Sequence, residues 1–444
     1  MIYHFCSEIS KGQIHGARVS TLSRHKLLKS YGYESKILGI SYSPNKSYLK
    51  KHSVELDDVL NLYDYFQKSD SLNVKNINHY KSVDIYEGDK KIKTEIYDSS
   101  GFLSKTKFFE NKRVLFEIFY NVYGEEVITK FYKNGIISFI RIKYNNQDVV
   151  FHTEEQLFSF FFDSILKKGD SVILEKRHDE FKTPWLPSFF AVEKRAKLFM
   201  YVHTDIIRRK TKKIYFKRIL KYENFIDGFI FTNKTQLEEV KKIHTKISNK
   251  MFVIPPGASF KYAKLNENKE NKIIIIGIRK GKRVDHSIKA FSQILEHIPN
   301  LELHICGGGS YQSALKKVSQ DLLIDKKVKF RGQLGREELL EEIKTAKLHL
   351  FASKSETFGL VLIETASFGI PSVSYDIKYG PSEIIEHGVS GYLTEEKPEE
   401  LAKYAIKLLK DEELYASFSK NLFEKTHKNF SEEIIFKKWK EILI

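Results

Sequence analysis

Two carboxylates flank the junction between an apolar segment and the segment that follows it. Glu356 and Glu364 stand eight residues apart in the stretch Ser-Glu-Thr-Phe-Gly-Leu-Val-Leu-Ile-Glu. The apolar run 348–352 predicts a buried strand, and 360–368 predicts a helix that Gly369 ends. The pair therefore lies across a strand-to-helix turn, with one carboxylate in the turn and one in the helix.

A helix that begins at such a turn suits a phosphorylated sugar. Its unpaired backbone N–H groups and its dipole attract anions at Gly359 and Leu360, and the glycine lets a diphosphate come close. Glu356 can face a sugar hydroxyl, while Glu364 can accept two hydrogen bonds from a ribose diol. An isolated pair of this kind is more often two solvated glutamates at a capped helix, so the surrounding residues decide.

The surrounding residues closely resemble the C-terminal domain of glycosyltransferase family 4. The resemblance is carried by Ser-Glu-Thr-Phe-Gly-Leu-Val-Leu-Ile-Glu-Thr-Ala, the later Gly-Ile-Pro-Ser-Val, and the segments 376–383 and 388–393. It covers most of 250–440 well and the N-terminal part more loosely. It implies a GT-B fold, in which two Rossmann-like domains face a cleft, and a retaining transfer from a nucleotide sugar. The run Asp-Ile-Lys-Tyr-Gly-Pro-Ser looks most like a subgroup that includes teichoic acid α-glycosyltransferases and serine-rich-adhesin glycosyltransferases.

The resemblance also implies site residues. Glu356 would orient the sugar, Glu364 would bind ribose, and the loop between them would complete the donor site with Thr357, Phe358, Gly359 and Leu360. The family places an arginine and a lysine on the first loop of the second domain to neutralise the diphosphate. Arg279 and Lys282 match them in type, although they are three positions apart instead of five. A solvated Arg279 stays an alternative, and Lys282 is the firmer assignment.

Three further positions resemble parts of the family's site. His203 ends an apolar strand and resembles the histidine near the reacting carbon, although a lone histidine there is more often structural. Gly16 resembles a glycine that admits the donor phosphate, with a turn glycine as the alternative. The segment 331–334 resembles the one whose backbone reads the uracil edge, and 307–309 predicts a turn beside the nucleotide.

Composition limits the class of protein. A length of 444 residues with 41% hydrophobic residues suits two or three domains with sizeable cores. The start of the chain lacks the features of a signal peptide and no apolar run nears ~20 residues, which predicts a cytoplasmic protein. Cys6 and Cys306 end apolar runs and predict buried thiols, and the histidines form no ligand cluster. We expect no metal and no cofactor beyond a UDP-sugar donor.

The net charge of +17 indicates an anionic partner or surface. The excess is concentrated in 208–221, which holds eight basic and no acidic residues, with apolar residues between them. An anionic polymer acceptor would meet Arg208, Arg209, Lys212 and Lys213. A merely solvated helix face and contact with anionic lipid at the inner face of the membrane are the alternatives. Nucleic acid is not expected, because no binding motif accompanies the charge.

The elements that must position these residues follow two patterns. Strands at 1–5, 34–38, 171–175 and 198–202, with a helix at 17–31, predict a Rossmann-like domain. Between them, residues 95–152 alternate β-branched and aromatic residues between evenly spaced turns, which predicts an inserted antiparallel β-meander. The predicted domains are 1–48 and 159–255 (N-terminal domain), 49–158 (insertion), 256–425 (C-terminal domain) and 426–444 (a helix returning to the N-terminal domain).

These patterns predict a retaining transferase that moves glucose or N-acetylglucosamine from a UDP-sugar to a surface acceptor. A polyol-phosphate teichoic acid is favoured as acceptor, and a serine-rich surface protein is the alternative. A noncatalytic glycosyltransferase-like adaptor is a further alternative. The family also suggests a homo-oligomer, or a partner glycosyltransferase, held through the insertion.

Overall fold

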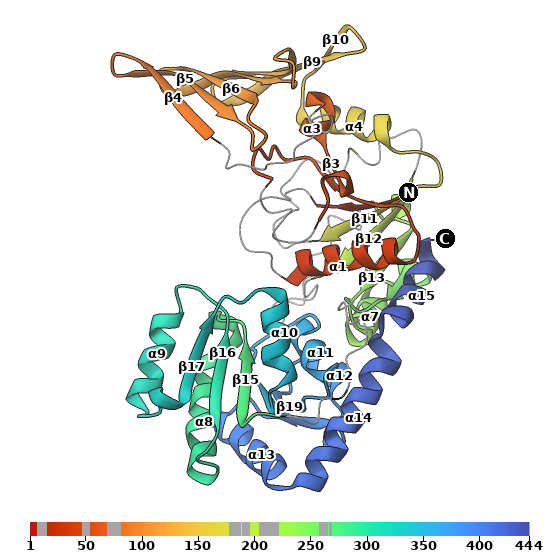
Figure 1. The fold of residues 1–444 in the computed structure, drawn as a ribbon. Coiled ribbons are helices and arrows are strands. Elements are labelled where there is room, and N and C mark those ends of the chain that lie inside the picture. Colours follow the sequence, from red (N-terminus) through yellow and green to blue (C-terminus); the bar gives the residue numbers. More distant parts are fainter. Residues whose placement is uncertain are drawn as a thin grey trace. The chain divides into compact units, whose positions relative to one another are not determined.

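The computed structural model of the protein describes the following residues (Figure 1): 1–6, 16–46, 54–68, 81–176, 188, 196–203, 222–256, 265 and 269–443. They divide into two compact units. The first contains the described residues up to Val202 together with 222–229, and the second contains His203 and the described residues from Ile230 onward. No helix among the described residues is long and apolar enough to cross a bilayer.

The Rossmann-like strands of the first unit belong to a seven-stranded sheet with the strand order β14-β13-β12-β11-β1-β2-β3. Strand β1 pairs in parallel with both β11 and β2. The predicted strands and the predicted helix are present, and each end lies within one residue of its prediction. The elements are β1 (Ile2–Phe5), α1 (Gly16–Ser30), β2 (Ser35–Gly39), β3 (Val59–Asn61), β11 (Ser171–Lys176), β12 (Lys197–Val202), β13 (Gly228–Phe231) and β14 (Met251–Val253).

The predicted antiparallel insertion is confirmed as a seven-stranded meander between β3 and β11. Its pairing register shifts at Ile85/Tyr86, Phe108/Phe109 and Phe131/Tyr132, at equal intervals in sequence, so β4–β5, β6–β7 and β8–β9 are equivalent hairpins. The strands are β4 (Lys81–Glu87), β5 (Lys90–Tyr97), β6 (Leu103–Glu110), β7 (Arg113–Tyr120), β8 (Glu126–Lys133), β9 (Ile136–Tyr144) and β10 (Gln147–Phe151).

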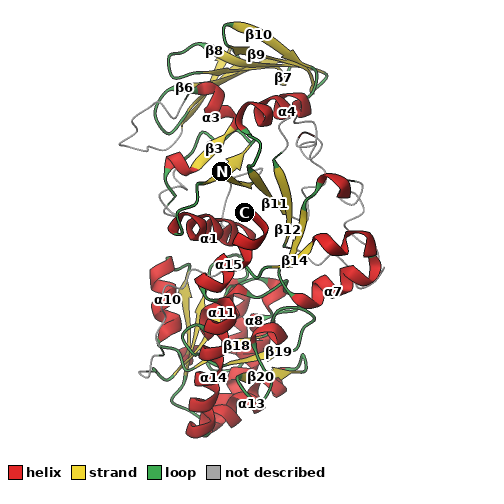
Figure 2. Cartoon of the chain, turned by 90° about the vertical axis from the view of Figure 1, so that its right-hand side faces the viewer, coloured by secondary structure: helices red, strands yellow, loops and turns green. Residues whose placement is uncertain are grey.

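Two helices pack against this sheet (Figure 2): α3 (Leu62–Gln67) contacts β8 and α4 (Glu154–Ile165) contacts β10. The Gln67 side-chain amide donates to the carbonyl oxygens of Ser104 at 2.6 Å and Tyr120 at 2.7 Å. Strand β3 lies within the predicted insertion yet pairs with β2 in the Rossmann-like sheet. The domain limits given above stay predictions.

The second unit is built on a six-stranded parallel sheet in the order β17-β16-β15-β18-β19-β20. Its central strands, β15 and β18, are mostly apolar and buried, which is typical of a parallel sheet with both faces covered, and His349 is the polar residue within β18. The strands are β15 (Lys272–Ile276), β16 (Glu302–Cys306), β17 (Val328–Gly332), β18 (Leu348–Phe351), β19 (Ser372–Tyr375) and β20 (Gly391–Thr394).

The helices of the second unit alternate with its strands, as the βα pattern predicts. Helix α11 ends two residues before the predicted limit of 368, and two turn hydrogen bonds lead from it to Gly369. The helices are α7 (Lys234–Ile243), α8 (Val284–His297), α9 (Gln312–Asp321), α10 (Arg336–Lys344), α11 (Leu360–Ala366), α12 (Pro381–Ile384), α13 (Pro398–Lys410), α14 (Glu412–Phe430) and α15 (Glu432–Leu443).

Candidate active site

The structure brings together the lysine and the glutamate that the sequence singled out. Lys282 Nζ lies 2.6 Å from Glu356 Oε1, and both side chains keep about a fifth of their surface exposed. The Ser353 hydroxyl donates to the same carboxylate oxygen at 2.9 Å. The loops that carry them are joined by a hydrogen bond from Lys354 N to the Gly281 carbonyl at 2.8 Å. The loop after β15 and the loop after β18 therefore form one site at the carboxyl ends of neighbouring parallel strands.

Arg279 lies on the same turn as Lys282. Its carbonyl accepts a hydrogen bond from Lys282 N at 2.8 Å, and it precedes the short 3-10 turn Lys280–Lys282. The structure thus places Arg279 beside the lysine along the chain. A role for its side chain in binding diphosphate stays a prediction.

Glu364 is buried within the first two turns of α11, with 6% of its surface exposed. Its carboxylate forms an ion pair with Arg336 Nη1, from the first position of α10. Burial without a partner would be costly for a carboxylate, so this ion pair offsets part of the cost. Sequence reasoning missed Arg336, because a charged residue in the first turn of a helix is normally solvated.

The turn between Glu356 and α11 is held by its backbone. The Thr357 carbonyl accepts hydrogen bonds from Thr232 Oγ1 at 3.0 Å and from Asn233 Nδ2 at 2.7 Å. Phe358 is buried against the Phe430 ring, with ring centroids 5.7 Å apart. The turn is therefore fixed from within the second unit, and sequence reasoning missed both residues that bind Thr357.

Two glycines allow this turn to pack as it does. Gly359 precedes α11 with φ of 92°, a left-handed conformation that a residue with a side chain adopts only at a cost. A Cβ on Gly380 would lie 2.1 Å from the Phe358 carbonyl oxygen, so only glycine fits there. Gly380 belongs to the Asp-Ile-Lys-Tyr-Gly-Pro-Ser run, which thus packs against the turn that carries the candidate donor residues.

The same run also binds helix α7. Lys378 Nζ lies 2.8 Å from Glu239 Oε2, and the Tyr379 hydroxyl donates to that carboxylate. The Glu383 carboxylate accepts from the backbone N–H groups of Lys234 and Thr235 at 3.2 and 3.4 Å. Because these N–H groups have no partner within the helix, Glu383 caps α7. The run that the sequence related to a subgroup is used here for positioning.

A buried histidine lies directly beneath the site. His349, on β18, is 1% exposed, and its Nδ1 lies 3.2 Å from Ser372 Oγ and 3.3 Å from Thr365 Oγ1. Burial, followed by the positive charge of Lys282, lowers its pKa to about 3. His349 is therefore neutral at physiological pH and adds no charge under the ion pair.

The remaining predicted site residues lie on separate elements. His203 directly follows β12 and is partly buried, and Gly16 is the first residue of α1. Arg208, Arg209, Lys212 and Lys213 lie outside the described residues. The functional roles of all six stay predictions.

The segments expected beside the nucleotide base meet at the end of β16. Gly307 N donates to the Gly332 carbonyl at 2.7 Å, which joins the glycine turn to the segment 331–334. The Arg331 side chain instead reaches α10, where its Nε lies 2.7 Å from Glu342 Oε1. The two predicted segments are thus adjacent through their backbones.

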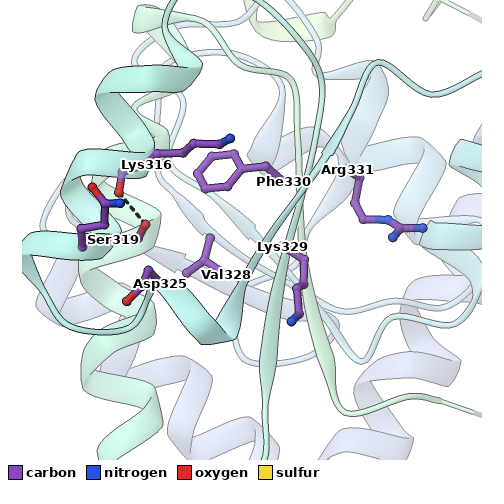
Figure 3. Close-up of a pocket in the computed structure, with 8 residues that line it drawn as sticks. Lys316, Ser319, Asp325, Val328, Lys329, Phe330 and Arg331 are labelled. Atoms are coloured by element: carbon purple, nitrogen blue, oxygen red, sulfur yellow. Dashed lines mark hydrogen bonds between the residues drawn. The ribbon is translucent and has the colours of Figure 1, made fainter.

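A cavity of about 380 Å³ opens between α9 and the edge strand β17 (Figure 3). Lys316 and Phe330 face it together, whereas the Arg331 side chain extends away from them. None of Lys282, Glu356 and Glu364 lines this cavity, so it is separate from the candidate donor residues.

Both cysteines are buried and outside any disulfide bond, as the sequence predicts. Burial raises the pKa of Cys306 to about 12, which disfavours its reactive thiolate form. Across the described part of the chain, no group of three or more His, Cys, Asp and Glu side chains could hold a metal ion. The expectation of metal-independent transfer stays a prediction.

Comparison with known proteins places this site in a family. Residues 259–425 match the model of the glycosyl transferases group 1. A poly(glycerol-phosphate) alpha-glucosyltransferase of Bacillus subtilis is 30% identical over 219 residues, 48% of this chain and 32% of that protein. A poly(ribitol-phosphate) alpha-N-acetylglucosaminyltransferase of Staphylococcus aureus is 23% identical over 437 residues, 94% of this chain and 86% of that protein. Some matches are short: the chain spans 17% of a Streptomyces coelicolor exopolysaccharide phosphotransferase that is 36% identical.

Solved structures with the same fold cover the whole chain. A TarM mutant of S. aureus in complex with fondaparinux, alpha-GlcNAc-glycerol and UDP has a TM-score of 0.82 and 20% identity, over 100% of this chain and 99% of that chain. The pneumococcal O-GlcNAc transferase GtfA in complex with UDP and GlcNAc has a TM-score of 0.79 and 19% identity, over 100% and 98%. The GT-B fold predicted from the sequence is confirmed. The segment 259–425, which contains Lys282, Glu356 and Glu364, thus matches the glycosyl transferases group 1, and most of the chain is similar to the S. aureus glycosyltransferase.

Proposed function

We propose that the protein transfers glucose or N-acetylglucosamine from a UDP-sugar to hydroxyls of a polyol-phosphate polymer, with retention of the anomeric configuration. The observation that carries the proposal is the 2.6 Å pair of Lys282 and Glu356 at the ends of neighbouring parallel strands. A cation for the diphosphate and a carboxylate for the sugar are thereby held in one place.

The pair suits both ends of the bond that breaks. A lysine ammonium has three N–H donors, and Glu356 occupies one of them, so the others can bind a phosphate oxygen. As the bond from the sugar C1 to the phosphate oxygen breaks, UDP leaves with the bonding electrons, and Lys282 stabilises the growing negative charge. Glu356 orients a sugar hydroxyl. The acceptor oxygen bonds to C1 on the face that UDP leaves, and the proton of the acceptor hydroxyl passes to the departing phosphate oxygen.

Glu364 provides the binding energy at the other end of the donor. Its carboxylate is fixed by Arg336 and buried, so its remaining lone pairs can accept hydrogen bonds from the two ribose hydroxyls. Binding energy at the ribose does not change during the reaction and therefore contributes to affinity rather than turnover.

The acceptor is proposed from the relatives. The B. subtilis and S. aureus proteins act on poly(glycerol-phosphate) and poly(ribitol-phosphate), as their names state, and the latter aligns with 94% of this chain. A polyol phosphate carries one negative charge per unit, which suits a chain of net charge +17. The likeness to GtfA, a peptide N-acetylglucosaminyltransferase subunit, favours a second candidate acceptor, the hydroxyls of a serine-rich protein.

One experiment separates these alternatives. The purified protein is incubated with UDP-glucose or UDP-N-acetylglucosamine and with poly(glycerol phosphate), poly(ribitol phosphate) or a serine-rich peptide. Release of UDP and transfer of sugar are measured, and the anomeric configuration of the product is determined by NMR. We expect an α-linked sugar on a polyol phosphate. Transfer only to the peptide supports the second candidate, and UDP binding without release from either donor supports a noncatalytic adaptor.

A further inference from the structure

Residues at the start of α7 contact the loop that carries Glu356. Thr232 and Asn233, which follow β13, are each 1% exposed, and both donate a hydrogen bond to the Thr357 carbonyl. Thr357 directly follows Glu356, and its carbonyl lies in the peptide that joins it to Phe358, so these bonds restrain the backbone of the loop that carries Glu356. We propose that Asn233 is a positioning residue that sets the orientation of Glu356, an inference that rests on the proposed function.

The Asn233 amide is used at both of its ends. Its Oδ1 accepts from Gln236 N at 2.7 Å and so caps α7, and its Nδ2 donates to Thr357 O at 2.7 Å. An amide that bonds on both sides has one orientation, because turning it over would bring oxygen against oxygen. The buried side chain of Asn233 therefore fixes the first turn of α7 and the loop that contains Thr357 relative to each other.

A second contact supports the same lock. Glu383 accepts three hydrogen bonds at the first turn of α7, from Lys234 N, Thr235 N and Thr235 Oγ1. Glu383 directly follows the Asp-Ile-Lys-Tyr-Gly-Pro-Ser run, and Gly380 within that run packs against the Phe358 carbonyl. The loop 356–359 is thus held by Asn233 at Thr357 and by Gly380 at Phe358, and both supports meet at the first turn of α7.

The substitution Asn233→Asp tests this role with almost no change of shape. Aspartate keeps the oxygen that caps α7, so the helix is preserved. It replaces the N–H donor by a carboxylate oxygen that repels the Thr357 carbonyl. When that carboxyl is protonated, its O–H again donates.

We expect Asn233→Asp to lower kcat for UDP release from the donor sugar about tenfold or more at pH 8, with the Kd for UDP within about threefold of the parent. Lys242→Ala, at an exposed position in the last turn of α7, is the control, because the Glu383 and Thr357 contacts lie at the first turn, and it should keep parental kcat. Parental kcat in Asn233→Asp, or equal losses in kcat and in affinity for UDP, would overturn the proposal.

Two further measurements keep the test decisive. Thr232→Val removes the other donor to Thr357 without changing the side chain's shape and should lower kcat in the same direction by a smaller factor. Hydrogen exchange of the segment 353–360 needs no activity, and we expect Asn233→Asp to accelerate it at neutral pH. If the parent protein neither binds UDP nor releases it from either donor, the proposed function fails. The hydrogen-exchange result then still tests whether Asn233 holds the loop 356–359. Unchanged exchange in Asn233→Asp would show that it does not.

Discussion

At the scale of single residues, the site separates binding from turnover. Glu364 is buried and fixed by Arg336, whereas about a fifth of the Glu356 side chain is exposed and its carboxylate oxygen contacts both Lys282 and Ser353. A fixed carboxylate suits a part of the donor that does not react, and a carboxylate paired with the diphosphate cation suits the reacting sugar. The two glutamates therefore have different expected phenotypes.

Glu364→Ala should weaken UDP binding with little change in kcat. A hydrogen bond to a charged group contributes about 1.5 to 3 kcal/mol, so the Kd should rise roughly tenfold or more. Calorimetric titration with UDP and with 2′-deoxy-UDP checks the cause. Because 2′-deoxy-UDP lacks one of the two ribose hydroxyls, its Kd should differ less between the parent and the variant than the Kd of UDP does. Glu341→Ala, an exposed glutamate on α10, is the control. Equal losses for both ligands would speak against ribose recognition.

Glu356→Gln should lower kcat more than it changes the KM for the donor. The amide keeps the shape but loses the charge that holds Lys282, so both the sugar and the lysine lose their fixed positions. Steady-state rates of UDP release at several donor concentrations distinguish the two parameters. Parental rates in this variant would remove Glu356 from the site.

At the scale of elements, the sequence predicted most of what is observed. The βα alternation, the turn signals of the insertion and the Glu356 to Glu364 spacing all act over short distances along the chain, so periodicity reveals them. Asn233 and Thr357, or Arg336 and Glu364, are brought together by the fold. The residues around Asn233 predict a helix cap and nothing further. A single sequence does not show that its side chain also binds the Thr357 carbonyl, which is distant along the chain. Sequence reasoning found the turns of the insertion but missed the equivalence of its three hairpins, which the register shifts show.

The packing of β18 against β19 and α11 should depend on pH through His349. Its folded-state pKa of about 3 lies below the ordinary 6.5, so its stabilising contribution is complete above pH 6.5 and is lost as the pH falls. Below pH 6.5 the unfolded chain binds a proton that the folded chain does not, which lowers the unfolding free energy by about 1.4 kcal/mol per pH unit. His349→Asn keeps a polar group without this titration. Urea unfolding at pH 7.5 and pH 5 should show a smaller acid-induced loss in the variant.

At the scale of the whole molecule, the charge of +17 should be evident in acceptor kinetics. Replacing Arg208, Arg209, Lys212 and Lys213 by serine should raise the KM for a polyol-phosphate acceptor and flatten its dependence on salt, because screening acts over roughly 8 Å at physiological ionic strength. The KM for the UDP-sugar should stay unchanged.

The control for this prediction removes the same charge elsewhere, at four exposed lysines of the second unit: Lys410, Lys420, Lys428 and Lys440. Equal effects of the two sets would show that only net charge matters. Unchanged acceptor kinetics in the first variant, with lost binding to anionic vesicles, would assign the stretch to the membrane surface.

The even register shifts of the insertion divide its sheet into hairpins of similar length, each with an irregularity at the same place. The contacts to this sheet do not repeat in the same way, because Gln67 binds Ser104 in β6 and Tyr120 in β7. Loss of the edge hairpin β4–β5 would therefore leave both bonds of Gln67 in place, whereas loss of β6–β7 would remove both of its acceptors.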